Sequence, residues 1–175
     1  MRSTTINNSR HPLYEAISAL YARSFPIFEQ RTSDQQAYAF AHSQYRLIAY
    51  TDQGELIGFI SYWEFEDYLY IEHFAINTDI RGRGYGSLLL STFVQSADRR
   101  ILLEIDPIVD EVSRARQRFY QRCGFHTNPY PHRYPPYRCS YPAHSLIVLT
   151  TEQVITEAEY QRFAQDLAQI VMLQP

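Results

Sequence analysis

Two arginines and three glycines lie close together in the stretch "IRGRGYG" at residues 80–86, and an apolar helical pattern follows at residues 86–97. The first N–H groups of a helix have no partner within the helix and lie at the positive end of its dipole. Glycines let a phosphate approach such main-chain groups, and Arg81 and Arg83 add full positive charges. The stretch therefore predicts an anion site at the start of a helix.

Nucleotides are the first ligands to consider for this loop. No Lys-Ser or Lys-Thr pair follows the last glycine, which argues against a nucleoside triphosphate. Gly82 and Gly84 begin the GxGxxG pattern of dinucleotide-binding proteins, and Glu104 follows at about the distance expected for a ribose-binding acid. However, Ser87 occupies the place of the third glycine. A dinucleotide-binding module remains an alternative, but a less favoured one.

The elements around the loop change character along the chain. Two helices are predicted first, the second beginning at Ser33 with Gln36 in a capping-box pattern. Strands at residues 45–50 and 55–63 flank "TDQG", a hairpin sequence, and a third strand is predicted at residues 68–76. These patterns indicate two helices followed by an antiparallel meander.

The second half alternates strand and helix. A strand at residues 100–106 follows the loop helix, and a helix at residues 111–123 precedes a last strand at residues 145–150. Strand–helix–strand alternation predicts a parallel strand pair with a right-handed crossover. Residues 126–144 are rich in proline and tyrosine and are not expected to be regular throughout, and Thr156 with Glu159 begins a C-terminal helix.

Composition excludes several classes of protein. The chain has 175 residues, is 45% hydrophobic and 20% charged, and has a formal net charge of −3. This is a globular composition, and an acidic balance argues against a nucleic-acid partner. Cys123 and Cys139 have neither metal-ligand nor disulfide-framework spacing, so we expect no metal and a cytoplasmic location. No signal peptide or membrane span is apparent, so no membrane partner is expected.

The pattern Arg81-x-x-Gly84-x-Gly86 resembles the acyl-CoA pyrophosphate loop of the GNAT superfamily of N-acetyltransferases. The stretches "IEHFAINTDIRGRGYGSLLLSTFV", "LLEID" and "FYQRCGF" are similar to that family's central strand, phosphate loop, next strand and following helix. The resemblance covers roughly residues 10–150. The sequence departs from the family pattern at Ser113, where many members carry Asn, and in the Pro/Tyr-rich segment.

The resemblance implies a mixed α/β (α+β) fold with a mostly antiparallel sheet, a splayed central strand pair and a central βαβ unit flanked by helices. It implies a single acetyltransferase domain over residues 1–175, with a core at about 10–150 and a C-terminal helical extension at 151–175. The co-substrate would be acetyl-CoA. The residues implied to bind it are Phe74, Ala75, Ile76, Arg81, Gly82, Arg83, Gly84, Tyr85, Gly86, Ser87 and Ser113.

The same resemblance implies an acyl-CoA-dependent N-acetyltransferase, in which a primary amine of a small molecule or peptide attacks the thioester directly. Tyr120 matches the tyrosine that faces the CoA sulfur in many members. Glu72 is the first choice for the base, because two-residue alternation puts it on the same face as Ile76. Glu104 is its rival, because it matches a glutamate of ribosomal-protein N-terminal acetyltransferases. A non-catalytic acyl-CoA-binding regulatory module is the alternative function.

The acceptor is less well defined by the sequence. Five acidic residues fall where this fold would place the acceptor, and an acidic mouth favours a cationic amine. They are Glu29, Glu64, Glu66, Asp67 and Glu72. The sequence does not name the amine, and it leaves the oligomeric state open, with a homodimer as one option.

Overall fold

The computed structural model describes residues 1–80 and 82–173 of the chain. Arg81, an expected member of the phosphate loop, lies outside the described residues. In chain order the elements are β1 (Arg2–Thr5), α1 (Tyr14–Ser24), η1 (Ile27–Glu29), α2 (Ser33–Ala41), β2 (Tyr45–Asp52), β3 (Glu55–Glu64), β4 (Tyr68–Ile76), η2 (Thr78–Ile80), α3 (Tyr85–Ser96), β5 (Arg100–Ile105), α4 (Glu111–Arg122), β6 (Phe125–Thr127), β7 (His132–Tyr134), β8 (His144–Thr151), α5 (Glu157–Asp166) and η3 (Leu167–Val171).

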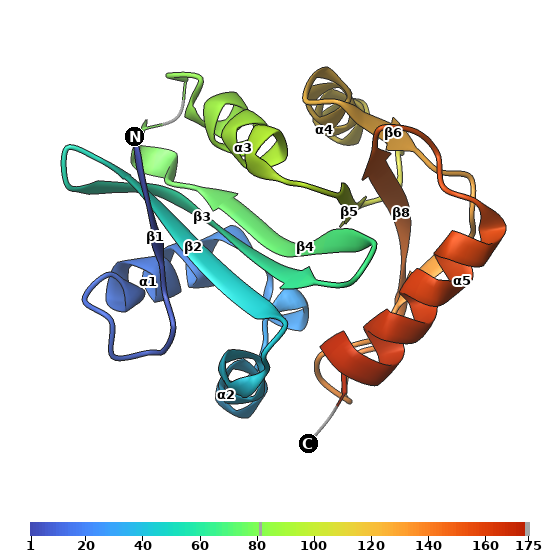
Figure 1. Cartoon of the computed structure of the whole chain (residues 1–175), viewed down its shortest axis with the longest axis horizontal. Coiled ribbons are helices and arrows are strands. Elements are labelled where there is room, and N and C mark those ends of the chain that lie inside the picture. The colour runs from blue at the N-terminus through green and yellow to red at the C-terminus, as the bar shows by residue number, and fades with distance from the viewer. Residues whose placement is uncertain (81, 174–175) are drawn as a thin grey trace.

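The strands form one mixed sheet in the order β1-β2-β3-β4-β5-β8-β6, and β7 also pairs with β8 (Figure 1). The β4–β5 pair is parallel and is connected through α3, whereas the other pairings are antiparallel. The predicted fold class, a mostly antiparallel mixed sheet around a central βαβ unit, is confirmed.

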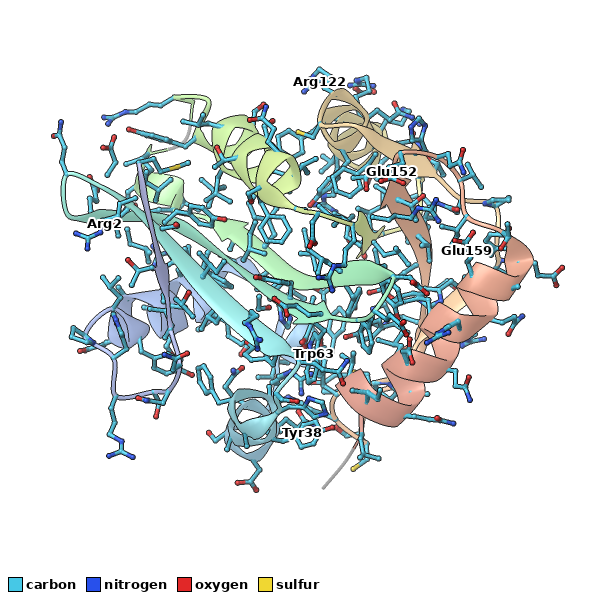
Figure 2. All side chains as sticks on the ribbon, in the orientation of Figure 1. Arg2, Tyr38, Trp63, Arg122, Glu152 and Glu159 are labelled. Atoms are coloured by element: carbon cyan, nitrogen blue, oxygen red, sulfur yellow. The ribbon has the colours of Figure 1, made fainter. Side chains whose placement is uncertain are left out.

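Helices cover both faces of this sheet. Helices α1, α2 and α5 bury their apolar residues on one face, in a cluster that includes Leu20, Trp63 and Phe163. Helices α3 and α4 cover the other face, where Leu89 and Phe125 belong to a second cluster. Figure 2 shows side chains filling the space on both faces of the sheet. Truncating a fully buried aromatic such as Trp63 costs about 3–5 kcal/mol, so these layers hold the strands that carry the site.

Local signals of the sequence explain several element boundaries. The β2–β3 hairpin turns through Gln53 and Gly54, both at positive φ, as the predicted hairpin requires. The capping box of Thr156 with Glu159 is confirmed at the start of α5. The predicted box of Ser33 with Gln36 is wrong by one residue, because the Thr32 side chain accepts the bond from the Gln35 N–H instead.

Residues outside the range 10–150 also belong to the sheet and to the hydrophobic core. Strand β1 begins at Arg2 and pairs with β2, so the sheet includes residues before position 10. At the other end, Phe163 and Val171 are buried in the first cluster, together with Tyr70 of the central strand. The C-terminal helix is therefore an integral part of the hydrophobic core, because it covers a sheet face that would otherwise be exposed.

The central strands diverge after a short contact. Strand β4 pairs with β5 only from Tyr68 to Tyr70, although β4 continues to Ile76 and β5 to Ile105. The register of β4 against β3 also shifts, because Ser61 pairs with His73 and the next pair is Tyr62 with Ile71. The unpaired edge of β4 confirms the expected splayed strand pair.

Within the described residues, none of the helices has both the length and the apolar character needed to cross a membrane.

Candidate active site

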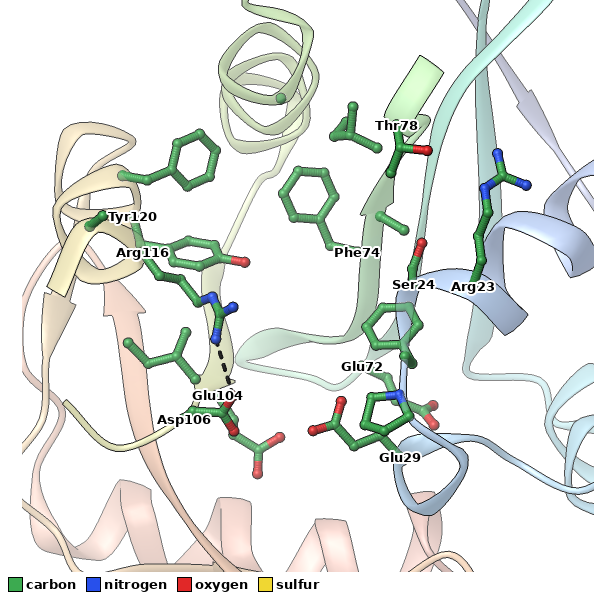
Figure 3. Close-up of a pocket in the computed structure, with 18 of the residues that line it drawn as sticks. Arg23, Ser24, Glu29, Glu72, Phe74, Thr78, Glu104, Asp106, Arg116 and Tyr120 are labelled. Atoms are coloured by element: carbon green, nitrogen blue, oxygen red, sulfur yellow. Dashed lines mark hydrogen bonds and ion pairs between the residues drawn. The ribbon is translucent and has the colours of Figure 1, made fainter. Parts of the chain in front are cut away.

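A cavity of about 1090 Å³ opens where β4 and β5 diverge (Figure 3). The N-terminus of α3 forms one end, the free edge of β4 and helix α4 form the walls, and η1 with the segment from β7 to β8 forms the other end. Its volume suits a long ligand together with a second small molecule. The splay thus creates a cavity that is lined by residues from both faces of the sheet.

The loop end of the cavity has features of an anion site. Gly82 and Gly84 adopt positive φ values of 85° and 74°, which favour glycine. No side chain caps α3 at Gly84, whereas α2, α4 and α5 all have capping boxes. The Tyr85 hydroxyl donates a hydrogen bond to Asp52 Oδ2 at 2.9 Å and ties the loop to the β2–β3 hairpin. The first residues of α3 therefore line the cavity, and among the described residues no side chain caps their N–H groups.

The edge of β4 forms the middle of the cavity. Phe74, Ala75 and Ile76, which the family resemblance implies bind the co-substrate, all line it. Gly58 on the neighbouring strand was not predicted to matter here, yet a Cβ atom at this position would lie only 2.4 Å from the Ala75 carbonyl oxygen. Gly58 lets β3 approach β4 closely, and an isolated glycine inside a strand pattern was the available signal.

Tyr120 of α4 lies against the second cluster and lines the cavity. Figure 3 shows its ring projecting from α4 beside Arg116. Within the described residues its hydroxyl makes no hydrogen bond. Burial raises the pKa of Tyr120 to about 12, against a smaller lowering by the Arg116 charge. The hydroxyl is therefore a neutral donor that is available to a ligand.

Glu72 does not present its carboxylate to the cavity. Its side chain is fully buried, and both oxygens are used: Arg31 binds bidentately at 2.7 and 3.1 Å, Trp63 Nε1 donates at 2.8 Å and the Tyr137 hydroxyl at 2.7 Å. Burial alone would raise the pKa of Glu72, but the Arg31 charge, helped by His73 and by these hydrogen bonds, lowers it to about 2. A carboxylate with such a low pKa and four donor contacts is poorly suited to accept a proton.

The β-bulge explains why the alternation argument for Glu72 is wrong. The register shift leaves Glu72 as the extra residue on β4. The Glu72 side chain contacts Trp63 and Tyr137 of the first cluster, whereas Ile76 packs against the second. Glu72 and Ile76 therefore point to opposite faces of the sheet, and the part of Glu72 that lines the cavity is its main chain.

Glu104 lies on β5 and lines the cavity. The Tyr70 hydroxyl donates to its Oε1, and His132 Nε2 lies 2.5 Å from its Oε2. Tyr70 and Tyr134 beside it belong to the first cluster, so Glu104 faces the sheet surface opposite to Tyr120. The two side chains approach the cavity from different faces of the splayed sheet (Figure 3).

The end of the cavity away from α3 is acidic and aromatic. Glu29 is half-buried, and in the described part of the chain its carboxylate has no hydrogen bond or ion pair. Burial and the nearby Asp106 charge raise the pKa of Glu29, with Arg116 opposing. Asp106 itself pairs with Arg116 at 3.1 Å. The aromatic residues that line this end are Phe25, Phe28, Tyr134, Tyr137 and His144.

Other predicted residues lie elsewhere. Arg83 is exposed and is not among the cavity-lining residues. Ser113, expected to contact the co-substrate, instead completes the capping box of α4: its N–H donates to Asp110 Oδ1, and its hydroxyl bonds to the Val109 and Asp110 N–H groups. The remaining predicted loop residues line the cavity: Gly82, Gly84, Tyr85, Gly86 and Ser87.

Several residues of the site were not predicted. Arg31 is buried against Glu72, and His132 and Tyr137 come from the Pro/Tyr-rich segment that was expected to be irregular. The only sequence signal for His132 and Tyr137 was the unusual density of tyrosine and histidine in residues 126–144. No local pattern indicates that this segment packs against Glu72 of β4 and Glu104 of β5. The contacting residues are 65 and 28 positions apart in the sequence.

The arrangement of loop, splayed strands and cavity is that of an acetyltransferase fold, and the sequence model of the acetyltransferase (GNAT) family matches residues 12–125. The chain belongs to the GNAT family. Over its full length it is similar to a GNAT-family protein of Bacteroides thetaiotaomicron, with 28% identity, a TM-score of 0.92, and coverage of 99% of this chain and 100% of the other.

Two further similarities are more distant. YjbC of Bacillus subtilis (strain 168), named as an acetyltransferase, is 29% identical over 108 residues, which are 58% of this chain and 52% of YjbC. The match thus spans about half the length of that relative. A GNAT-family acetyltransferase of Elizabethkingia anophelis, solved with acetyl-CoA bound, has a TM-score of 0.58 at 14% identity, covering 87% of this chain and 97% of the other. That likeness concerns the fold.

Among the described residues, no group of three or more His, Cys, Asp or Glu side chains is arranged to hold a metal ion.

Proposed function

We propose that this protein transfers the acetyl group of acetyl-CoA to a primary amine, with Glu104 as the proton acceptor and Tyr120 as the hydrogen-bond donor to the departing sulfur. The observation that supports this proposal is the position of the two side chains. They line one cavity from opposite faces of the splayed sheet, on either side of the free β4 edge. The amine attacks the thioester carbon while the sulfur leaves from it, so the reaction needs one side chain near the amine and another near the sulfur.

The residues that line the cavity at the N-terminus of α3 are suited to bind acetyl-CoA. Acetyl-CoA would supply a thioester, an activated acyl group that an amine can attack without further activation. The N–H groups of Gly84, Tyr85 and Gly86 would hold its pyrophosphate at the start of α3. A Cβ at Gly86 would meet Ile76 and Phe119 only at ordinary contact distances of 3.6 and 3.8 Å. The protein itself thus leaves room for a side chain at position 86, and we infer that glycine there keeps the main chain open to the pyrophosphate.

The acceptor must lose a proton before it can attack. An amine near the reference pKa of ~10.4 is cationic at neutral pH, and neutralising it costs about 4–5 kcal/mol. Glu104 is the carboxylate best placed to accept that proton, because the Glu72 carboxylate is enclosed by Arg31 and is held at a pKa of about 2. A positioned base of this kind contributes about 10²–10⁴-fold to the rate.

Tyr120 supports the leaving group without giving up its proton. A thiol has a reference pKa near ~8.5, so full proton transfer from a tyrosine with a pKa of about 12 is uphill by roughly 5 kcal/mol. We infer that the neutral hydroxyl stabilises the developing thiolate by a hydrogen bond and that the final proton on sulfur comes from solvent.

We further infer that the acceptor is cationic. Of the five acidic residues considered in the sequence, Glu29 lines the cavity with its side chain and Glu72 with its main chain, whereas Glu64, Glu66 and Asp67 lie outside it. Burial and Asp106 disfavour the charged form of Glu29, and a second ammonium group on the acceptor would relieve this cost. The aromatic rings at this end provide cation–π contacts for the same group.

Binding and turnover test the proposal separately. In a thermal-shift panel, a ligand at 100 times its Kd adds about 2.7 kcal/mol of stability. Acetyl-CoA and CoA should stabilise the protein, and NAD should not. A shift with NAD alone would instead support the dinucleotide-binding alternative.

Thiol release from acetyl-CoA is then measured with a panel of primary amines. Diamines should outperform monoamines that carry no second charge at low salt, and Glu29→Gln should raise KM for diamines, whereas Glu66→Gln, at an exposed turn outside the cavity, should not. Glu104→Gln should keep the acetyl-CoA shift and lose at least tenfold in kcat. Binding of acetyl-CoA without turnover of any amine would indicate a regulatory acyl-CoA-binding module instead.

A further inference from the structure

Glu104 is the first member of a chain of polar side chains that leads away from the cavity. His132 of β7 places Nε2 at 2.5 Å from Glu104 Oε2, and its Nδ1 lies 2.8 Å from the hydroxyl of Tyr160 on α5. The Tyr160 hydroxyl also lies 3.1 Å from the Pro131 carbonyl oxygen. The side chains of His132 and Glu104 are only 2% and 6% exposed, so water screens this contact poorly.

The hydroxyl of Tyr160 has one proton and two acceptors within reach. When His132 is neutral with its proton on Nε2, Nε2 donates to Glu104 and Tyr160 can donate to Nδ1. When His132 is an imidazolium, its Nδ1–H donates to the Tyr160 oxygen, and the hydroxyl turns to donate to the Pro131 carbonyl. All hydrogen-bonding groups of His132 are therefore satisfied in both protonation states.

The tyrosines around this pair do not compete for the proton. Burial raises the pKa values of Tyr70 and Tyr134 well above the usual tyrosine range, and burial together with the Glu104 charge raises that of Tyr160. All three stay protonated at neutral pH. Among the described side chains packed against one another here, that leaves the Glu104 carboxylate and the His132 imidazole facing each other.

The other buried histidine near the cavity, His73, is differently placed. Its Nε2 lies 2.9 Å from the Glu29 carbonyl oxygen, and its Nδ1 lies 3.7 Å from the carboxylate of Glu72, which Arg31 already neutralises. Burial lowers the pKa of His73, despite the Glu72 charge. His73 thus remains a neutral structural residue, and it lacks the two-acceptor hydroxyl that serves His132.

We propose that His132 is a positioning residue: with Tyr160 it orients Glu104 and controls the charge beside it, and Glu104 accepts the proton released by the acceptor amine. This inference rests on the proposed function. In the balanced reaction an ammonium group loses two protons as the C–N bond forms and the C–S bond breaks. The first proton moves to the Glu104 carboxylate, so that the free amine can attack. The second is released as the amide forms; the CoA thiolate takes up one proton, and one proton is released to solvent overall.

The test measures the protonation of His132 directly. Long-range ¹H–¹⁵N spectra of the ring nitrogens, recorded from pH 5 to 9 on the full chain without acceptor, follow each histidine, and His132→Gln identifies the resonance. Tyr160→Phe removes the hydroxyl but retains the ring. A hydrogen bond to a charged group is worth about 1 kcal/mol more than one to a neutral group, so the His132 midpoint should fall by about one pH unit.

Two matched variants control for general effects. Tyr130→Phe removes the hydroxyl of the ring that stacks on Tyr160, but that hydroxyl donates to the Ile155 carbonyl and not to His132. His126→Gln removes an exposed histidine of β6. Both should leave the His132 midpoint unchanged. An equal shift with Tyr130→Phe would overturn the specific role of Tyr160.

Kinetics provide the second measurement. With the most active amine of the panel, the acidic limb of kcat/KM should move to lower pH in Tyr160→Phe by the same amount as the spectroscopic midpoint, with the acetyl-CoA thermal shift retained. The proposal fails if His132 does not titrate between pH 5 and 9, or if its midpoint is the same in Tyr160→Phe. The spectra need no acceptor, so they decide this proposal even where acetyl transfer itself is not found.

Discussion

Replacing Glu72 with Gln should reduce stability much more than it reduces catalysis. The Glu72 and Arg31 side chains are 0% and 3% exposed and form a bidentate pair, so the substitution leaves a buried guanidinium without its counter-charge. Breaking a buried pair by removing one partner costs about 3–5 kcal/mol. The pKa gives an independent value, since a fall from 4.5 to about 2 corresponds to about 3 kcal/mol at neutral pH.

Urea unfolding followed by far-UV circular dichroism measures this difference at pH 7. For a chain of 175 residues, a loss of about 3 kcal/mol also lowers Tm by roughly 6–12 °C. The matched control is Glu64→Gln, because Glu64 pairs with Arg46 at 3.5 Å with side chains 35% and 38% exposed. Such a surface pair contributes less than about 1 kcal/mol.

The pH dependence of this difference has a definite sign. The folded-state pKa of Glu72 lies below its unfolded value, so its contribution is complete above about pH 4.5 and is lost as the pH falls towards 2. The wild type and Glu72→Gln should therefore converge in stability below pH 4.5. An equally stable Glu72→Gln that loses a hundredfold or more in kcat would refute the structural role and restore Glu72 as the base.

The other predictions concern Tyr120, the phosphate loop and the cap of α4. Tyr120→Phe should retain the acetyl-CoA thermal shift and lose at least tenfold in kcat. The loss should be the same from pH 6 to 10, because the pKa of Tyr120 is about 12. A loss that changes across this range would show that the hydroxyl titrates. Gly84→Val, at a φ of 74°, should abolish the acetyl-CoA shift, whereas Gly54→Val, at a φ of 81° in the β2–β3 turn and not among the cavity-lining residues, should lower Tm and leave the shift intact. Ser113→Ala should cost about 1 kcal/mol in urea unfolding without changing acetyl-CoA affinity, and a tenfold weaker affinity would return Ser113 to the co-substrate site.

Local chemistry made much of the fold predictable. The change from helical to two-residue periodicity defines the elements, the "TDQG" sequence defines the β2–β3 turn, and the glycines around position 84 define an uncapped helix start. Each of these signals depends on neighbouring residues and on main-chain preferences, so it can be read without knowing the rest of the molecule. The family follows from the same stretch, because the loop and its flanking strand and helix are continuous in sequence.

The partners of the acidic residues were decided by contacts that no local pattern encodes. A single bulge at Glu72 reverses the face that alternation predicts and turns the first-choice base towards Arg31, 41 residues away. His132 reaches Glu104 only because the Pro/Tyr-rich segment folds back along β8. The sequence by itself determined the order of the elements and the loop that can hold an anion. Only the tertiary structure decided which carboxylate is neutralised in the core and which one faces the cavity, because burial and charge pairing depend on residues far apart in the chain.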